Sequence, residues 1–280
     1  MKGRLGVKKN WIIVAATVGL LVAIGLVIKI AHPSGTKNGT PEVSISTNFD
    51  GALKSASALE EQGELLKAQG ALKNMIATYT SNPRIEEVQK RLEDLNMRII
   101  VSAISVPGLS VVHEVKTGDS LSSLGDQYHT TIALIKKENG LASDVLRLGM
   151  PLRIWTGKFS VFVDKSQNVL LLQNNGELVK TYHVATGKNN ITPVGNFKII
   201  NKLVHPAWTH EGKVIPPESP ENILGARWLG FDMPGYGIHG TTQPDSIGKQ
   251  ATAGCVRMLN SEVEELYDLL PIGTEVTIKD

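Results

Sequence analysis

The sequence predicts a multidomain chain of the α+β class, on three observations. Residues 49–105 are rich in helix-forming residues whose apolar positions recur at helical spacing. Residues 111–155 carry the signals of a strand, two short helices and a closing strand. Residues 158–280 contain short β-favouring runs separated by turn residues. The prediction is a short helical segment, a βααβ module and a mostly-β domain, preceded by a single N-terminal transmembrane helix.

Residues 1–30 predict a basic cytoplasmic stub followed by a membrane anchor. Four basic residues before position 10 precede an uninterrupted apolar run over residues 11–28, which is just long enough to cross a bilayer as a helix. Because positive charge marks the cytoplasmic side, the N-terminus is expected inside and the rest of the chain outside. A cleaved signal peptide is the alternative, but its apolar core is usually shorter and ends at a small-residue site that is not clear here.

The next two segments connect this anchor to the modules. Residues 31–48 are rich in Ser, Thr, Asn, Gly and Pro and predict a flexible linker. Across residues 49–105 the helical pattern, broken at Asn82 and Pro83, predicts two or three amphipathic helices. Residues 58–83 faintly resemble one tetratricopeptide helical pair, although a single copy is not an array. The segment is interpreted as a helical spacer, or as a surface for self-association or for a protein partner.

Net charge and residue spacing argue against a nucleic-acid partner and against a metal site. The chain has 280 residues and a formal net charge of +2 at pH 7, so nucleic acid is not an expected partner. A zinc site formed by His205, His210, His239 and Cys255 is the metal alternative. No two of these residues show the short paired spacing of metal motifs. Neither a metal nor a cofactor is expected.

The βααβ module has clear capping signals. Ser120 is expected to cap a helix over residues 121–128, and Thr130 or Thr131 a second helix that stops at Asn139. Three motifs resemble a LysM domain and lie at residues 115–121, 139–141 and 148–152.

The LysM resemblance implies binding of glycans that contain N-acetylglucosamine, chiefly peptidoglycan and chitin. In this family the sugar lies between the first strand-to-helix turn and the second helix-to-strand loop. The residues that the resemblance implies for sugar contact are Gly118, Asp119, Ser120, Leu121 and Asn139.

The only cysteine, Cys255, is the strongest candidate for chemistry. A thiol becomes a useful nucleophile when a base takes its proton or a cation lowers its pKa, and His239 lies upstream of it. The alternative is a small buried hydrophobe, but the neighbouring Gly254 and the cation of Arg257 favour a reactive thiol. An unpaired cysteine in an oxidising compartment also indicates reactivity. An activated thiol is expected to titrate well below about 8.5.

In the C-terminal domain only residues 261–270 predict a helix, with Ser261 as N-cap and Glu264 completing a capping box. Five motifs in order resemble the catalytic domain of the L,D-transpeptidases across residues 158–280. They lie at residues 187–197, 205–208, 222–228, 236–241 and 252–258. One departure is Ala253, where many members carry histidine.

The L,D-transpeptidase resemblance implies a role for each matching residue. Cys255 would be the nucleophile and His239 the general base and acid. The backbone carbonyl of Gly240 would orient His239, and the backbone around Gly254 would stabilise the oxyanion. The remaining residues that the family places in its substrate pocket are Arg257, Thr252, Tyr236 and Trp228.

By the same resemblance, the enzyme cleaves the bond between the L-centre of a peptidoglycan tetrapeptide stem and its terminal D-alanine. It transfers the acyl group to an amine of another stem, giving a 3→3 cross-link. The alternatives are an L,D-carboxypeptidase, in which water resolves the thioester, and a non-catalytic LysM cell-wall-binding protein. The expected location is the bacterial cytoplasmic membrane, with a single span and the LysM and catalytic domains in the periplasm or cell wall.

Overall fold

The computed structural model describes residues 48–280. The predicted anchor and all but the last residue of the predicted linker lie outside these residues. Within them, no helix is both long enough and apolar enough to cross a bilayer. The described residues all belong to one compact unit.

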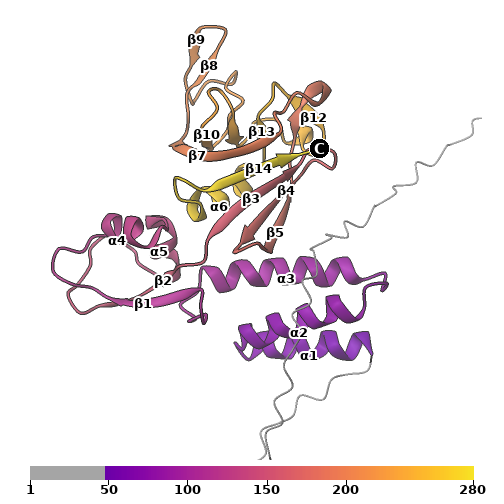
Figure 1. Ribbon diagram of the computed structural model, residues 1–280, viewed down its shortest axis with the longest axis vertical. Coiled ribbons are helices and arrows are strands. Elements are labelled where there is room, and N and C mark those ends of the chain that lie inside the picture. The colour runs from indigo at the N-terminus through magenta and orange to yellow at the C-terminus, as the bar shows by residue number, and fades with distance from the viewer. Residues whose placement is uncertain (1–47) are drawn as a thin grey trace, which may run out of the picture. The chain divides into compact units, whose positions relative to one another are not determined.

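Three helices open the described chain, α1 (Phe49–Glu61), α2 (Leu65–Thr78) and α3 (Ile85–Ile100), as Figure 1 shows. Asn48 caps α1, since its side chain accepts a hydrogen bond of 2.6 Å from the N–H of Gly51. The helices bury a shared apolar core of Phe49, Ala56, Ala68, Leu72, Met75, Val88, Leu92, Leu95 and Ile99. This small bundle realises the predicted amphipathic pattern with three helices.

The helical segment is attached to the β domain through α3, which packs against strand β5 (Glu177–His183). The Asn96 amide donates to the carbonyl of Val179 at 3.0 Å, and the Thr181 hydroxyl donates to Glu93 at 2.9 Å. Strand β5 is the edge of the large sheet. The helix therefore covers an edge strand that would otherwise expose unpaired backbone groups.

The βααβ module follows with β1 (Ser110–Glu114), α4 (Leu121–Tyr128), α5 (Ile132–Glu138) and β2 (Pro151–Trp155). Strands β1 and β2 pair antiparallel. Ser120 caps α4 as predicted, by accepting from the N–H of Ser123 at 3.1 Å. Thr131 rather than Thr130 caps α5, by accepting from the N–H of Leu134 at 2.9 Å.

The C-terminal domain is built on an eight-stranded sheet with the order β13-β11-β10-β7-β14-β3-β4-β5. Its other strands are β3 (Phe159–Asp164), β4 (Val169–Asn174), β7 (Gly195–Val204), β10 (Arg227–Phe231), β11 (Gly237–His239), β13 (Val256–Arg257) and β14 (Glu275–Lys279). Two small pairs join β6 (Thr186–Gly187) to β12 (Gln250–Thr252) and β8 (Trp208–His210) to β9 (Lys213–Ile215). Two 3₁₀ turns, η1 (Lys188–Asn190) and η2 (Pro244–Ser246), lie in the loops.

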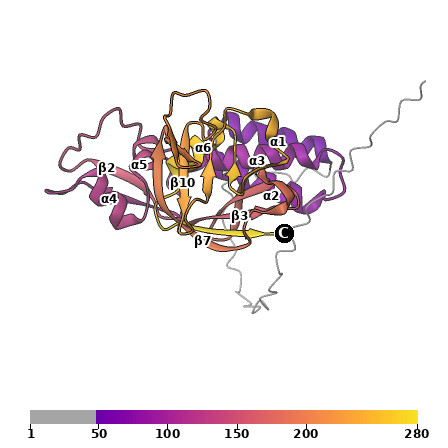
Figure 2. The same cartoon turned by 90° about the horizontal axis from the view of Figure 1, so that it is seen from above.

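Helix α6 (Asn260–Leu269) packs against β10 and β11, and Figure 2 shows α6 next to β10 from above. The predicted N-cap at Ser261 is wrong. The helix begins one residue earlier, its N-cap residue is Leu259, and no side chain caps it. Ser261 therefore lies inside the first turn, while the side chain of Asn260 bonds to other loops.

A buried ion pair joins α3, α5 and β2. Arg153 and Glu138 are 4% and 1% exposed, and the guanidinium donates to the carboxylate at 2.5 Å and to the carbonyl of Ile100 at 2.6 Å. The second Glu138 oxygen accepts from the N–H of Trp155 at 3.1 Å. Burial raises the pKa of Glu138 to about 7, against the opposing effect of Arg153. This pair fixes the βααβ module to its neighbours.

Candidate active site

Three neighbouring strands carry predicted site residues on one face of the sheet. Trp228 on β10 pairs with His239 on β11, and His239 pairs with Arg257 on β13. Directly paired residues point to the same side of a sheet. Cys255 immediately precedes β13 and lies two residues before Arg257. Ile238 and Val256 point to the other side and are fully buried in the core.

His239 is held in one tautomer. Its side chain is 2% exposed, and Nδ1 lies 2.7 Å from the carbonyl oxygen of Gly240. A carbonyl only accepts, so Nδ1 donates its hydrogen to Gly240, and the backbone of Leu224 is a second hydrogen-bond partner of the imidazole. Burial, followed by the charge of Arg257, lowers the pKa of His239 to about 4. The imidazole is therefore neutral at pH 7 and able to accept a proton.

Cys255 is partly exposed, and its thiol lies 3.5 Å from the carbonyl oxygen of Gly235. Burial raises the pKa of the Cys255 thiol, and this outweighs the lowering effects of the N–H of Gly237 and the charge of Arg257. Desolvation therefore outweighs the nearby cation. At pH 7 Cys255 is a neutral thiol and His239 a neutral imidazole.

This resting state predicts a distinct pH dependence for thiol modification. The rate of Cys255 alkylation by iodoacetamide is expected to keep rising from pH 7 to beyond pH 9, because only the thiolate reacts and it forms late. Mass spectrometry of the carbamidomethylated peptide measures the rate, with a small free thiol as reference. A rate that reached its plateau below about pH 8 would contradict this assignment and indicate a thiolate–imidazolium pair.

A tight turn places the thiol. The N–H of Gly254 donates to the hydroxyl of Thr252 at 3.1 Å, and that hydroxyl donates to the carbonyl of Cys255 at 2.7 Å. Gly254 has φ +127°, and a Cβ there would lie 2.7 Å from the ring of Tyr236, so only glycine fits. Thr252 is thus a residue of the turn. The Gly254 N–H is thus occupied, whereas the N–H of Cys255 donates no hydrogen bond within residues 48–280.

Trp228 packs directly against His239. Its indole stacks on His239 with ring centroids 6.1 Å apart and an interplanar angle of 22°. Its Nε1 donates to Asn201 at 3.0 Å. Added Cβ atoms at Gly230 and Gly237 would lie 2.6 and 2.9 Å from the indole, so these two glycines make room for it. The motifs predicted Trp228 but not Asn201, which bonds to its indole, or the two glycines that leave space for the ring.

Arg257 is 2% exposed, and its guanidinium donates to Gln243 and Ser246 at 3.0 Å each. Its Nε is buried without a partner. Among the described residues no carboxylate pairs with this guanidinium. A buried cation without a counterion is costly unless an anion joins it.

Comparisons with known proteins agree with this geometry. Residues 158–278 match the family model of the YkuD-type L,D-transpeptidase catalytic domain, and residues 113–155 match that of the LysM domain. YqjB of Bacillus subtilis strain 168, named for the same family, is 43% identical over 126 residues, which is 43% of this chain and 70% of YqjB. YkuD of the same strain is 34% identical over 175 residues, which is 60% of this chain and 98% of YkuD.

The chain belongs to the L,D-transpeptidase family. Among solved structures, an L,D-transpeptidase from Mycobacterium smegmatis aligns with a TM-score of 0.38 and 18% identity, over 47% of this chain and 64% of its own. One from Mycobacterium tuberculosis H37Rv aligns with a TM-score of 0.39 and 14% identity, over 48% and 63%. The chain spans less than two thirds of either solved protein.

In the LysM domain of this L,D-transpeptidase, most predicted sugar contacts have structural roles. Leu121 is buried in the module's own core. Ser120 is the α4 cap, and Asp119 bonds to the N–H of Lys116 and to His113, both at 2.7 Å. The remaining residues behave differently from one another: the Asn139 amide bonds to three backbone groups, of Ile135 and Arg153, and Gly118 (φ +92°) has open space where a side chain would be. The side chains of Leu121, Ser120, Asp119 and Asn139 are thus engaged within the module itself, which does not support glycan contact through them.

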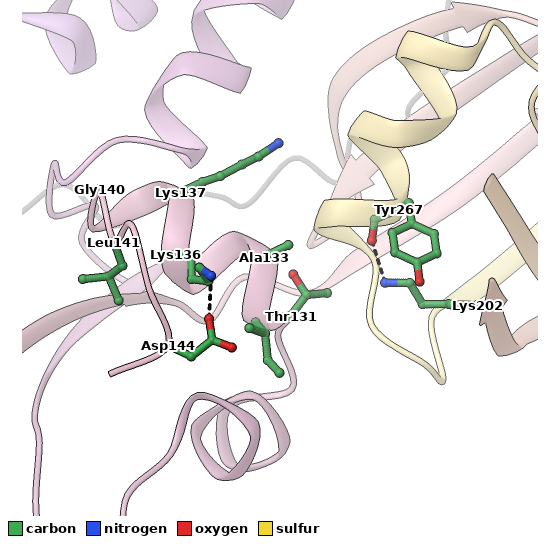
Figure 3. Close-up of a pocket in the computed structure, with 10 residues that line it drawn as sticks. Thr131, Ala133, Lys136, Lys137, Gly140, Leu141, Asp144, Lys202 and Tyr267 are labelled. Carbon is green, nitrogen blue, oxygen red and sulfur yellow. Dashed lines mark hydrogen bonds and ion pairs between the residues drawn. The ribbon is translucent and has the colours of Figure 1, made fainter. Parts of the chain in front are cut away.

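A cavity of about 700 Å³ lies between α5 of the LysM domain and α6 of the catalytic domain. None of the catalytic candidates lines it. Figure 3 shows its polar groups, with Lys136 paired to Asp144 and Lys202 donating to the carbonyl of Tyr267. Within residues 48–280 no cluster of three or more His, Cys, Asp or Glu could hold a metal.

Proposed function

We propose that this L,D-transpeptidase acts on peptidoglycan stem peptides through a Cys255 acyl-enzyme. The observation that carries the proposal is the placement of His239, a neutral imidazole whose Nδ1–H is held by Gly240, on the strand that pairs with β13, the strand that directly follows Cys255. A base fixed in this way can remove the thiol proton as the sulfur attacks.

The reaction proceeds in two balanced steps. His239 Nε2 takes the Cys255 proton while Sγ bonds to the carbonyl carbon between the L-centre of the third stem residue and D-alanine. The resulting oxyanion is stabilised by the N–H of Cys255. The tetrahedral intermediate collapses to a thioester as D-alanine leaves with the proton from His239. An amine of a second stem then attacks the thioester, His239 takes a proton from that amine and passes it to the departing Cys255 thiolate, and a 3→3 amide cross-link remains.

The surroundings of Arg257 support the binding of a negatively charged substrate group. Its buried guanidinium has no carboxylate partner among residues 48–280 and lies two residues from the nucleophile. The terminal carboxylate of the D-alanine stem would supply the missing charge and place the scissile bond near Cys255. Tyr236 and Trp228 would flank the peptide.

The remaining parts support action at the cell wall. The LysM domain would hold the glycan, and tethering raises the local concentration of stem peptides around the catalytic site. We retain the proposed division into an anchor (1–30), a linker (31–48), a helical segment (49–105), a LysM domain (111–155) and a catalytic domain (158–280). In this arrangement both folded domains face the outside of the bacterial cytoplasmic membrane, and a protein partner for the helical segment remains part of the proposal.

Incubation of the full-length chain with purified disaccharide tetrapeptide, followed by mass spectrometry, tests the proposal. Dimers that lack one D-alanine are expected with the wild type and not with Cys255→Ala. If trimmed monomers are the only product, the activity is that of an L,D-carboxypeptidase rather than a transpeptidase. The absence of both products, together with retained binding to intact cell wall, would overturn the enzymatic proposal in favour of a wall-binding protein.

A further inference from the structure

Asn260, the first residue of α6, joins two loops at the active site. Its Oδ1 accepts hydrogen bonds from the N–H groups of Ala226 at 3.0 Å and Thr241 at 2.9 Å. Its Nδ2 donates to the carbonyl of Thr241 at 2.9 Å. Two donors face one end of the amide and an acceptor faces the other, so only one orientation of the side chain satisfies all three groups.

The two loops leave space for this amide by means of glycine. A Cβ at Gly225 would lie 2.3 Å from Asn260 Oδ1, and a Cβ at Gly240 would lie 2.2 Å from it. Both distances are far below contact, so neither position accepts a larger residue while the asparagine stays in place. The loop before β10 and the loop after β11 therefore converge on one side chain.

The contact with Thr241 bears directly on the catalytic base. The Gly240 carbonyl and the Thr241 N–H belong to one peptide group, which is planar and trans, so they point in opposite directions. Asn260 Oδ1 holds the N–H end, and the carbonyl at the other end receives Nδ1–H of His239 at 2.7 Å. Fixing one end of this plane therefore aims the other end at the imidazole.

We propose that Asn260 is a positioning residue that sets the tautomer and ring orientation of His239 through the Gly240–Thr241 peptide. Accepting a hydrogen bond from the Thr241 N–H also polarises that peptide, which makes the Gly240 carbonyl a better acceptor. The proposal rests on the proposed role of His239 as the base. Arg257 is the one charged group that acts on His239 from a neighbouring strand, and it is not touched by Asn260.

The test replaces Asn260 with alanine in the full-length chain. With ¹⁵N-labelled histidine, the His239 signals, assigned with His239→Gln, are expected to change from the single Nδ1–H tautomer to a mixture of tautomers. The kcat for cross-linking is expected to fall about 10- to 100-fold, since small misplacement of a catalytic group costs that much, with KM changed less than about twofold. Ser261→Ala, an exposed neighbour in the same helical turn, is the matched control and should change neither readout.

A conservative variant separates positioning from folding. Asn260→Asp keeps an acceptor for the two N–H groups, so it is expected to restore the Nδ1–H tautomer, and its negative charge should raise the pKa of His239 in the pH profile. A lower unfolding temperature in Asn260→Ala with an unchanged tautomer and pH profile would overturn the proposal. The tautomer of His239 is measured in the absence of substrate. If the wild type makes no product, the proposed function is overturned, and the histidine spectra still decide whether Asn260 positions His239.

Discussion

Replacing Cys255 with alanine is expected to lower the rate of acyl transfer by about 10⁶-fold, the scale seen when a covalent nucleophile is deleted. No other thiol exists in the chain to substitute for it. The side chain is only partly buried, and its thiol bonds to two backbone groups, the carbonyl of Gly235 at 3.5 Å and the N–H of Gly237, so the fold should persist. Product formation by mass spectrometry gives the rate, and an unchanged unfolding temperature is the control. Activity within about tenfold of the wild type would exclude Cys255 as nucleophile.

The matched variant His239→Gln is expected to show a different defect. It keeps the nucleophile and removes the base, which contributes about 10²- to 10⁴-fold. Because the thiol can lose its proton unaided at alkaline pH, activity of His239→Gln should rise with pH, whereas that of Cys255→Ala should not. In the wild type the base stays neutral above the lowered pKa of about 4, so its activity should not fall as pH drops from 7 to 5 through histidine protonation. Parallel pH profiles for the two variants would contradict the assigned roles.

The motifs pointed to the candidate residues but not to their protonation. The spacing of His239 and Cys255 in two motifs, together with the family resemblance, pointed to a shared site, and strand pairing places His239 directly opposite Arg257, two residues after Cys255. The direction of the Cys255 pKa shift depends on how much protein surrounds the thiol. Burial arises from strands and loops far away in the sequence, so the neighbouring Arg257 alone does not determine the direction of the shift.

Residues that act through the backbone were not predictable. Asn260 follows a loop and starts a helix, and its sequence context resembles an ordinary helix start, which is why Ser261 next to it was taken as the cap. Its partners, Ala226 and Thr241, come from two other loops. The docking of α3 on β5 was equally hidden, because the contact between Asn96 and Val179 joins residues 83 apart. The helical, βααβ and mostly-β classes were predictable because they depend on local periodicity and turn residues.

Replacing Arg153 with leucine is expected to produce the largest loss of stability. The substitution leaves Glu138, 1% exposed, buried without its counterion, and frees the carbonyl of Ile100. Removing one partner of a buried ion pair costs about 3–5 kcal/mol. Adding Glu138→Leu should recover part of that loss, since the isolated carboxylate is then gone, although the N–H of Trp155 loses its acceptor at a cost of about 1–3 kcal/mol.

The pH dependence of this loss identifies its cause. Burial raises the folded-state pKa of Glu138 to about 7, above the ordinary value of 4.5. The folded state therefore binds this proton more tightly, and the associated stability is present below about pH 4.5 and is lost as pH rises through about 7. Without Arg153, whose charge lowers the pKa of Glu138, the folded-state pKa should rise further. Urea unfolding of Arg153→Leu should thus show a larger deficit at pH 8 than at pH 5, while the double variant should show little difference between them. An equal deficit at both pH values would mean that lost packing on Trp155, rather than the stranded carboxylate, causes the destabilisation.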